Sequence, residues 1–267
     1  MKRILLLCIC ILAAWNLRAQ YEAENKAFKA GERVTYDLYF NWKFIWVKAG
    51  TAEMAITDTT YGGRPAYRTY LQTKGNKRAD FFFIMRDTLE NIMSHQLVPY
   101  YFRKGAEEGK RYTVDEVHYT YRDGKCHVDQ SRVRRGGKTR TAHDVSDYPV
   151  YDMLSILARA RSFDPTDYVP GQKIHFPMAT GTKVEEQTLI FRGREVIEAN
   201  DKRRYRCLKL SFVEYKDGQE KEVITFFVTD DLNHLPVRLD MFLNFGSAKA
   251  FLTKIEGNRH PISSLVE

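Results

Sequence analysis

Residues 34–46, VTYDLYFNWKFIW, alternate large apolar side chains with mostly polar ones. Successive side chains of a β-strand point to opposite faces, so this pattern predicts a strand with one strongly apolar face. A single strand of about 13 residues is longer than most globular strands, which predicts either a bend near Asn41 or a strongly curved sheet. The apolar positions on the predicted face are Val34, Tyr36, Leu38, Phe40, Trp42, Phe44 and Trp46.

Short turn sequences recur along the chain. Asp-Gly and Gly-Gly pairs between alternating apolar segments are typical of β-hairpins, and they occur here in YGGRP, RDGK, RGGK and KDGQ, at 61–65, 122–125, 135–138 and 216–219. They predict an antiparallel meander. The strand-like segments on either side of them include 111–121, 125–135, 138–145, 203–215, 220–230, 235–245 and 248–257.

One segment differs from this β pattern. Residues 148–164 contain no glycine and place Leu, Met, Ala and Arg at helical spacing, with Asp147 as a candidate cap and Asp164-Pro165 as a stop. This predicts one connecting helix of about three turns between a β-rich half at 20–147 and another at 165–267, within one integrated domain. The predicted fold is mainly β: a curled antiparallel sheet or open, barrel-like architecture with one central helix.

The N-terminus predicts export. Lys2 and Arg3 precede an apolar run from Ile4 to Trp15, followed by a small-residue exit at Ala19, a pattern typical of a cleaved signal peptide at 1–19. The run is shorter than the roughly 20 residues that span a bilayer. Cys8 and Cys10 lie inside the run, so no lipidation is expected. We therefore expect a protein of the periplasm or the extracellular space with no transmembrane segment.

Charge and cysteine content set further limits. The 42 basic residues, less Lys2, Arg3 and Arg18, face 34 acidic residues, so the net charge falls from +8 to +5 after cleavage. Such a moderate charge, together with export, argues against a nucleic-acid partner. Cys126 and Cys207 remain. Export allows a disulfide between them, and two buried thiols are the alternative.

Several segments in a specific order resemble the bacterial envelope family known as domain of unknown function 3108. They are FKAGERVTYDLYF, VKAGTAEMAI, LVPYYFRKGAEEGKR, YDMLSILARAR, GREVIEANDKRRYRCLKL and FFVTDDLNHLPVRLDMFLNFGSAKAFL. The resemblance spans nearly all of the chain after residue 19, with Phe227 at a position where tryptophan is more usual. It implies an exported, β-rich protein with no assigned reaction, so it supplies no catalytic residue.

Catalytic and metal signals are weak. There is no Gly-x-Ser-x-Gly segment, no Cys-His signature, no phosphate-binding loop and no close ligand pair typical of zinc sites. No metal or cofactor is expected, and the pattern favours a protein that is not an enzyme. The rival is an extracytoplasmic hydrolase with paired carboxylates. The carboxylates considered for it are Asp37, Asp87, Glu90, Asp152 and Asp240.

Two binding surfaces are predicted. Phe40, Trp42, Phe44 and Trp46 are predicted to line a concave surface that binds a hydrophobic or amphiphilic ligand, such as a lipid, or an envelope protein partner. A scaffold subunit that recruits partners through exposed strand edges is a further alternative. The basic hairpin SRVRRGGKTR is predicted to contact an anionic surface, or else to be a solvated hairpin tip. The contact residues in this hairpin are Arg132, Arg134, Arg135 and Lys138.

Overall fold

The computed structural model describes residues 21–42, 45–76, 85–108, 111–200, 202–243 and 246–266. Strands dominate, as the alternating pattern predicts. They are β1 (Arg33–Trp42), β2 (Ile45–Tyr61), β3 (Arg64–Gly75), β4 (Met85–Ser94), β5 (Pro99–Glu108), β6 (Arg111–Arg122), β7 (Lys125–Arg134), β8 (Arg140–Ser146), β9 (Lys173–Ala179), β10 (Val184–Glu198), β11 (Arg204–Lys216), β12 (Gln219–Thr229), β13 (Pro236–Leu243), β14 (Gly246–Glu256) and β15 (Leu265–Val266).

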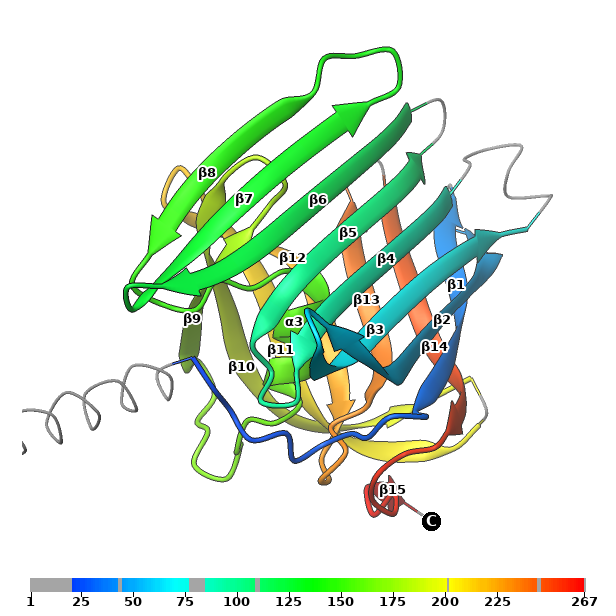
Figure 1. The fold of residues 1–267 in the computed structure, drawn as a ribbon. Helices are drawn as coiled ribbons and strands as arrows, with labels where there is room; N and C mark the ends of the chain where they lie inside the picture. Colours follow the sequence, from blue (N-terminus) through cyan, green and yellow to red (C-terminus); the bar gives the residue numbers. More distant parts are fainter. Residues whose placement is uncertain are drawn as a thin grey trace, which may run out of the picture.

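All the named strands belong to one antiparallel sheet. Its order is β8-β7-β6-β5-β4-β3-β2-β1-β14-β13-β12-β11-β10-β9, with the short β15 paired to β11. β1 pairs with β14, so one continuous sheet runs through both halves of the chain. Figure 1 shows this sheet curled into two facing layers, with β3 to β8 in one and β10 to β14 in the other. The predicted curled antiparallel fold is confirmed.

The turns follow the glycine signals in the sequence. Asp123-Gly124 and Asp217-Gly218 both have two successive positive φ angles, which tight two-residue hairpins require. Gly62-Gly63 joins β2 to β3 in the same conformation.

The apolar run at 34–46 forms a hairpin instead of one long strand. β1 ends at Trp42 and β2 begins at Ile45. The two strands pair with Asn41 opposite Trp46 and Phe40 opposite Val47. The expectation of a single strand is therefore wrong. No Asp-Gly or Gly-Gly pair marks this turn, so its position was not visible in the sequence.

The helix, α3 (Met153–Ala160), is shorter than predicted and lies between the two layers of the sheet (Figure 1). Asp152, not Asp147, caps it: the Asp152 carboxylate accepts hydrogen bonds from the backbone N–H groups of Leu154 and Ser155, and Ser155 Oγ accepts one from the Asp152 N–H. This reciprocal capping box fixes where the helix begins. Tyr151 is extended and forms a parallel bridge with Met178 of β9.

A buried ion pair holds the far end of α3. The Arg161 guanidinium donates to both carboxylate oxygens of Glu32, at 2.6 and 2.9 Å, and to the backbone oxygen of Asn233. The side chains of Arg161 and Glu32 are only 5% and 1% exposed. The helix is therefore fixed at both ends to the sheet that surrounds it.

Hydrogen bonds link strands near one edge of the sheet to a turn at the other edge, where no strands pair. Arg132 of β7 donates to Asp115 of β6 and also to the backbone oxygen of Thr180, in the turn after β9. The Gly181 N–H donates to Gln130 Oε1 at 2.9 Å. We call these contacts the seam. They tie the β9–β10 turn to the β6–β7 pair.

Substitution of Gly181 tests the seam. A Cβ at Gly181, where φ is +90°, would lie 2.7 Å from Asp115 Cγ. Gly181→Ala should therefore lower the free energy of unfolding by about 2 kcal/mol or more, since backbone strain adds to the clash. Gly171 has a similar φ of +93° with nothing within 4 Å. In urea unfolding, Gly171→Ala should cost only about 1 kcal/mol; equal costs for the two variants would contradict the tight seam.

The two cysteines do not form a disulfide. Cys126 and Cys207 are both buried and free, and they pack in different hydrophobic clusters. Burial raises the pKa of Cys207 to about 12 and raises that of Cys126 as well. Both thiols therefore stay protonated and act as small apolar side chains.

Candidate functional site

The inner face of the second half carries rows of large apolar side chains. The strand register places Phe40, Ala248, Met241, Ile224 and Phe212 side by side across five neighbouring strands. The next row contains Leu239, Phe226 and Leu210. We call the large members of both rows the inner apolar surface: Phe40, Leu210, Phe212, Ile224, Phe226, Leu239 and Met241.

This surface faces the helix. Leu210, Phe212 and Phe226 pack beside the buried side chains of Tyr151, Phe176 and Leu189, together with Ile156 of α3. All seven members of the surface are only partly buried. Large apolar groups on the inner side of a curled sheet would normally be fully buried in a dry core. Their partial exposure is the feature that marks this surface as a candidate binding site.

Small residues border the same rows. Leu38 pairs with Gly50 on one side and with Ala250 on the other, and Gly50 pairs with Gly75. A Cβ at Gly50 would lie 2.1 Å from the backbone oxygen of Lys74. The close approach of β2 and β3 therefore requires glycine at this point, and the inner face carries no side chain there.

The structure separates the four predicted ligand-binding residues. Phe40 lies on the inner apolar surface. Trp46 pairs with Asn41, so it lies on the opposite face of the sheet from Phe40, where Lys249 Nζ sits 4.8 Å from its ring centroid. The prediction that both rings share one face is wrong because the unmarked turn reverses the alternation. Trp42 ends β1, and Phe44 lies outside the described residues.

Sequence reasoning assigned only Phe40 of this surface to a site, and it did not single out the two members in β11. Leu210 and Phe212 alternate with Lys209 and Ser211, which is the same period-two signal that identified β1. The apolar faces of β12 and β13 were visible in the sequence, but their assembly with β11 depends on the strand register.

The structure also separates the four predicted contact residues of the basic hairpin. Arg132 is half-buried in the seam, bound to Asp115 and Thr180. Arg134, Arg135 and Lys138 are exposed around the β7–β8 turn. Only these three remain accessible to an anionic surface.

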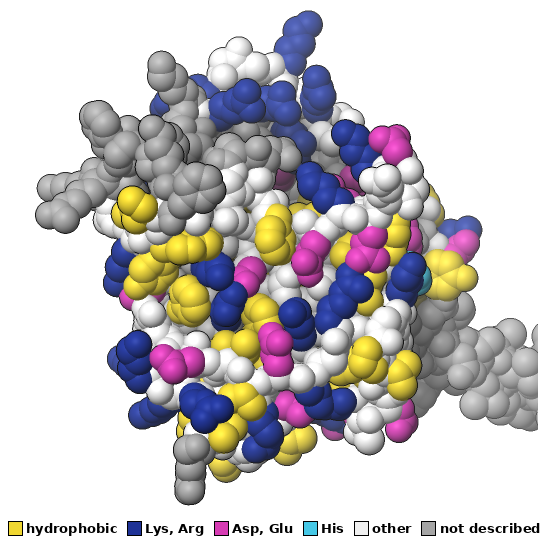
Figure 2. Space-filling view, turned by 180° about the vertical axis from the view of Figure 1, so that it is seen from behind, with side chains coloured by type: hydrophobic (Ala, Val, Ile, Leu, Met, Phe, Trp, Pro, Cys, Tyr) yellow, Lys and Arg dark blue, Asp and Glu magenta, His cyan; other side chains and the backbone are white. Residues whose placement is uncertain are grey.

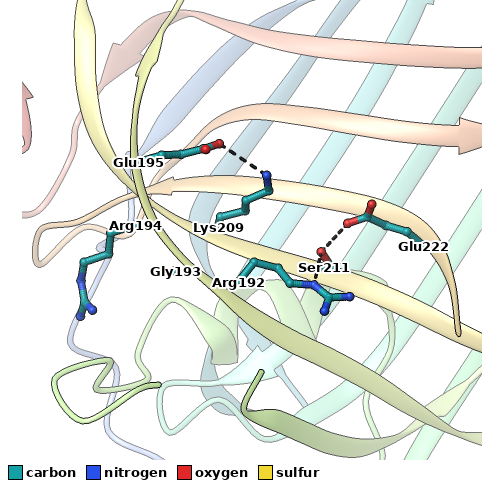
Figure 3. Close-up of a pocket in the computed structure, with 7 residues that line it drawn as sticks. All are labelled: Arg192, Gly193, Arg194, Glu195, Lys209, Ser211 and Glu222. Carbon is teal, nitrogen blue, oxygen red and sulfur yellow. Dashed lines mark hydrogen bonds and ion pairs between the residues drawn. The ribbon is translucent and has the colours of Figure 1, made fainter. Parts of the chain in front are cut away.

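A polar cavity of about 300 Å³ lies on the outer face of β10, β11 and β12 (Figure 3). Lys209 pairs with Glu195 at 3.8 Å, and Arg192 pairs with Glu220. The Ser211 hydroxyl accepts a hydrogen bond from Arg192 and donates one to Glu222, which also accepts one from Thr225. Figure 3 shows Arg194 directed away from the other lining residues.

The electrostatics of this cavity do not favour acid–base chemistry. Burial acts to raise the pKa of Glu222, but hydrogen bonds from Ser211 and Thr225 and the positive charges of Arg192 and Lys209 outweigh it and lower the pKa. Glu222 is therefore an ionised carboxylate at neutral pH and a poor general acid. The ion pairs of this cavity account for its polar lining.

Asp152 has the perturbed pKa that a catalytic carboxyl often shows. Burial raises its pKa to about 6, against the opposing effect of its hydrogen bonds from Ser155, Leu154 and Asn91. The side chain is completely buried, and Asn91 Nδ2 donates to Oδ2 at 2.7 Å. Its oxygens serve the helix cap and this buried network, so the shift reflects a structural role.

Three of the other carboxylates considered for catalysis lie in separate ion pairs. Among the residues that the structure describes, no group of three His, Cys, Asp or Glu side chains is arranged to hold a metal ion. The pairs are Asp37 with Lys48, Glu90 with Arg68, and Asp240 with Arg238.

A single open, curled antiparallel sheet with a helix between its layers and a partly exposed inner apolar surface defines the class of this protein. Comparison with known sequences then places it: the chain belongs to the family described as "Protein of unknown function (DUF3108)", which it matches over residues 35–253. No curated protein matches it.

Among solved structures, the chain is similar to a "Beta-barrel-like Protein of Domain of Unknown Function DUF1849 from Brucella abortus". The TM-score is 0.54 at 12% sequence identity, covering 86% of this chain and 99% of the other. At this identity the likeness supports the fold alone. Within the described part of the chain, no helix has the length and apolar character needed to cross a bilayer.

Proposed function

We propose that this protein is an exported, non-enzymatic component of the bacterial envelope that binds a hydrophobic or amphiphilic molecule on its inner apolar surface. The observation that carries the proposal is the partial exposure of seven large apolar side chains on the inner face of the sheet. Covering such side chains with an acyl chain or a similar group removes apolar area from water, at about 25 cal/mol per Å².

The position of α3 supports this function. The helix is held at one end by the Asp152 cap and at the other by the Glu32–Arg161 pair. It packs against part of the inner face through Ile156 and leaves the neighbouring rows partly exposed. A rigid helix beside an apolar surface gives a bound molecule a preformed boundary, which reduces the cost of ordering the site on binding.

Export is part of the proposal and is supported by the N-terminal sequence. Residues 1–19 combine two cationic residues, an apolar run and a small-residue exit. Two free, buried thiols are compatible with either side of a membrane. N-terminal sequencing of the protein recovered from the periplasmic and extracellular fractions of the host tests this part: a first residue at Gln20 is expected, and retention of residues 1–19 in the cytoplasm would contradict it.

The binding function is tested by two substitutions in neighbouring strands. Met241 of β13 belongs to the inner apolar surface, and Phe251 of β14, equally partly buried, lies opposite Arg238 on the outer face. In native mass spectrometry of the chain from residue 20 with lipid extracts, Met241→Gln should reduce the population of bound species severalfold. Phe251→Gln should leave it unchanged, and equal behaviour of the two variants would count against the site.

A further inference from the structure

Two adjacent hairpins end in exposed apolar side chains. β1 pairs with both β2 and β14, and β14 pairs with β13, so the β1–β2 and β13–β14 hairpins lie side by side. We call the exposed apolar residues at their ends the apolar tip: Ile45 (66% exposed), Trp46 (40%), Val47 (46%), Phe242 (43%) and Leu243 (41%). With strands about 4.8 Å apart, these residues extend across four neighbouring strands.

The apolar tip is apolar on both faces of the sheet. Val47 lies opposite Phe40 on the inner face, whereas Trp46 lies opposite Asn41 on the outer face. Phe242 and Leu243 are consecutive in β13 and so also point to opposite faces. One flat protein surface covers only one face of a sheet. A lipid bilayer surrounds an inserted edge on both sides, so this arrangement fits insertion among lipids.

Cations lie at the same end of the sheet. Because every neighbouring pair is antiparallel, β1, β7 and β13 run in the same direction and their following turns share one rim, the upper rim in Figure 1. The β7–β8 turn brings Arg134, Arg135 and Lys138 to this rim, and among the described residues these three form no ion pair. Lys249 sits over the Trp46 ring.

Figure 2 shows the same arrangement from behind. Hydrophobic side chains gather on the left at mid-height, on the side where Figure 1 places β1 and β2, and Lys and Arg side chains lie along the upper end of the molecule. Exposed apolar groups beside cations are the combination that binds anionic membranes, since the headgroups attract the cations and the acyl region takes up the apolar groups.

We propose that the upper rim docks on an anionic lipid bilayer, with the apolar tip inserted at the interface and the β7–β8 turn on the headgroups. This inference rests on the proposed function and extends it. Phe40 of the inner apolar surface lies directly opposite Val47 of the tip. When the protein is bound to the membrane, its inner apolar surface therefore lies next to the bilayer that supplies the amphiphilic ligand.

The native tryptophans report the docking directly. After residue 19 the only tryptophans in the chain are Trp42 and Trp46, both in the β1–β2 hairpin. The chain from residue 20 is mixed with vesicles of phosphatidylcholine, or of phosphatidylcholine and phosphatidylglycerol. Cosedimentation and a blue shift of tryptophan emission are expected with the anionic vesicles. Binding to the neutral vesicles should be weaker by a factor of roughly ten or more.

Charge reversal on one rim tests the role of the cations. Arg134→Glu and Arg135→Glu together should weaken binding to the anionic vesicles roughly tenfold or more. Lys29→Glu and Arg64→Glu, which change exposed cations at the opposite end of the sheet, should leave binding within about twofold. Equal losses in the two variants would show that only net charge matters and would overturn the proposal.

Apolar substitution tests insertion. Ile45→Ser with Leu243→Ser should abolish the blue shift and lower binding roughly tenfold. Tyr148→Ser with Leu232→Ser, at similarly exposed positions away from the upper rim, should change neither. Failure of the wild-type chain to bind anionic vesicles would remove the docking proposal, while the soluble lipid complex and its loss in Met241→Gln would still stand.

Discussion

Replacing Glu32 with alanine should lower the free energy of unfolding by about 3–5 kcal/mol, which is the usual cost of leaving one charge of a buried pair uncompensated. Glu32 and Arg161 are nearly inaccessible, and Arg161 is held in a bidentate pair with a further bond to the Asn233 backbone. The guanidinium would lose its carboxylate in an apolar setting beside the Phe28 ring. Urea unfolding at neutral pH measures the loss.

An exposed pair supplies the control for this result. Glu24 and Lys26 lie 3.4 Å apart with side chains 75% and 65% exposed, so Glu24→Ala should cost less than about 1 kcal/mol. Glu32→Met combined with Arg161→Met should recover part of the single-variant loss, because it removes both buried charges. A cost for Glu32→Ala as small as that for Glu24→Ala would show that the pair does not anchor α3.

Asp152→Asn should change stability in a way that depends on pH. Burial raises the pKa of Asp152 from 3.8 to about 6 in the folded protein, so between those values the folded state binds more protons than the unfolded state. Stability contributed by this group is therefore complete below about pH 4 and is lost as the pH rises through 6, a change of about 3 kcal/mol. The asparagine variant does not titrate.

The measurement compares wild type and Asp152→Asn across pH. Between about pH 4 and pH 8, the free energy of unfolding of the variant should rise relative to wild type by about 3 kcal/mol, since only the wild type must ionise a buried carboxyl. Other titrating groups are common to both proteins and cancel in the difference. A difference that stays constant over this range would mean that Asp152 is not ionising in its buried network.

The sequence predicts the fold well where local chemistry determines it. The Asp123-Gly124 and Asp217-Gly218 turns adopt the positive φ angles that their residue types favour. The alternation of Val34, Tyr36 and Leu38 places these side chains in the core. These signals are local, so a single sequence is sufficient to detect them.

Errors arise where a local signal is absent or two signals compete. The turn after Trp42 has no glycine, so the period-two pattern continues through it and misplaces Trp46. Asp147 and Asp152 are both good helix caps, but only Asp152 has Ser155 three residues later to complete the box.

Local sequence patterns do not predict contacts between segments that are distant in the chain. Arg132 reaches Thr180, 48 residues away, across the seam, and nothing near Arg132 in the sequence distinguishes it from Arg134. The inner apolar surface likewise depends on the register of β11 to β14, which the sequence pattern does not specify.

Photo-crosslinking with a long-chain fatty acid that carries a diazirine near its terminal methyl group tests binding at the inner apolar surface most directly. After irradiation and proteolysis, we expect labels on peptides that contain Phe212, Phe226 and Met241, and loss of labelling in competition with unmodified fatty acid. Labels confined to the outer face of the sheet, around Lys209 and Arg238, or the absence of any saturable labelling would contradict the account.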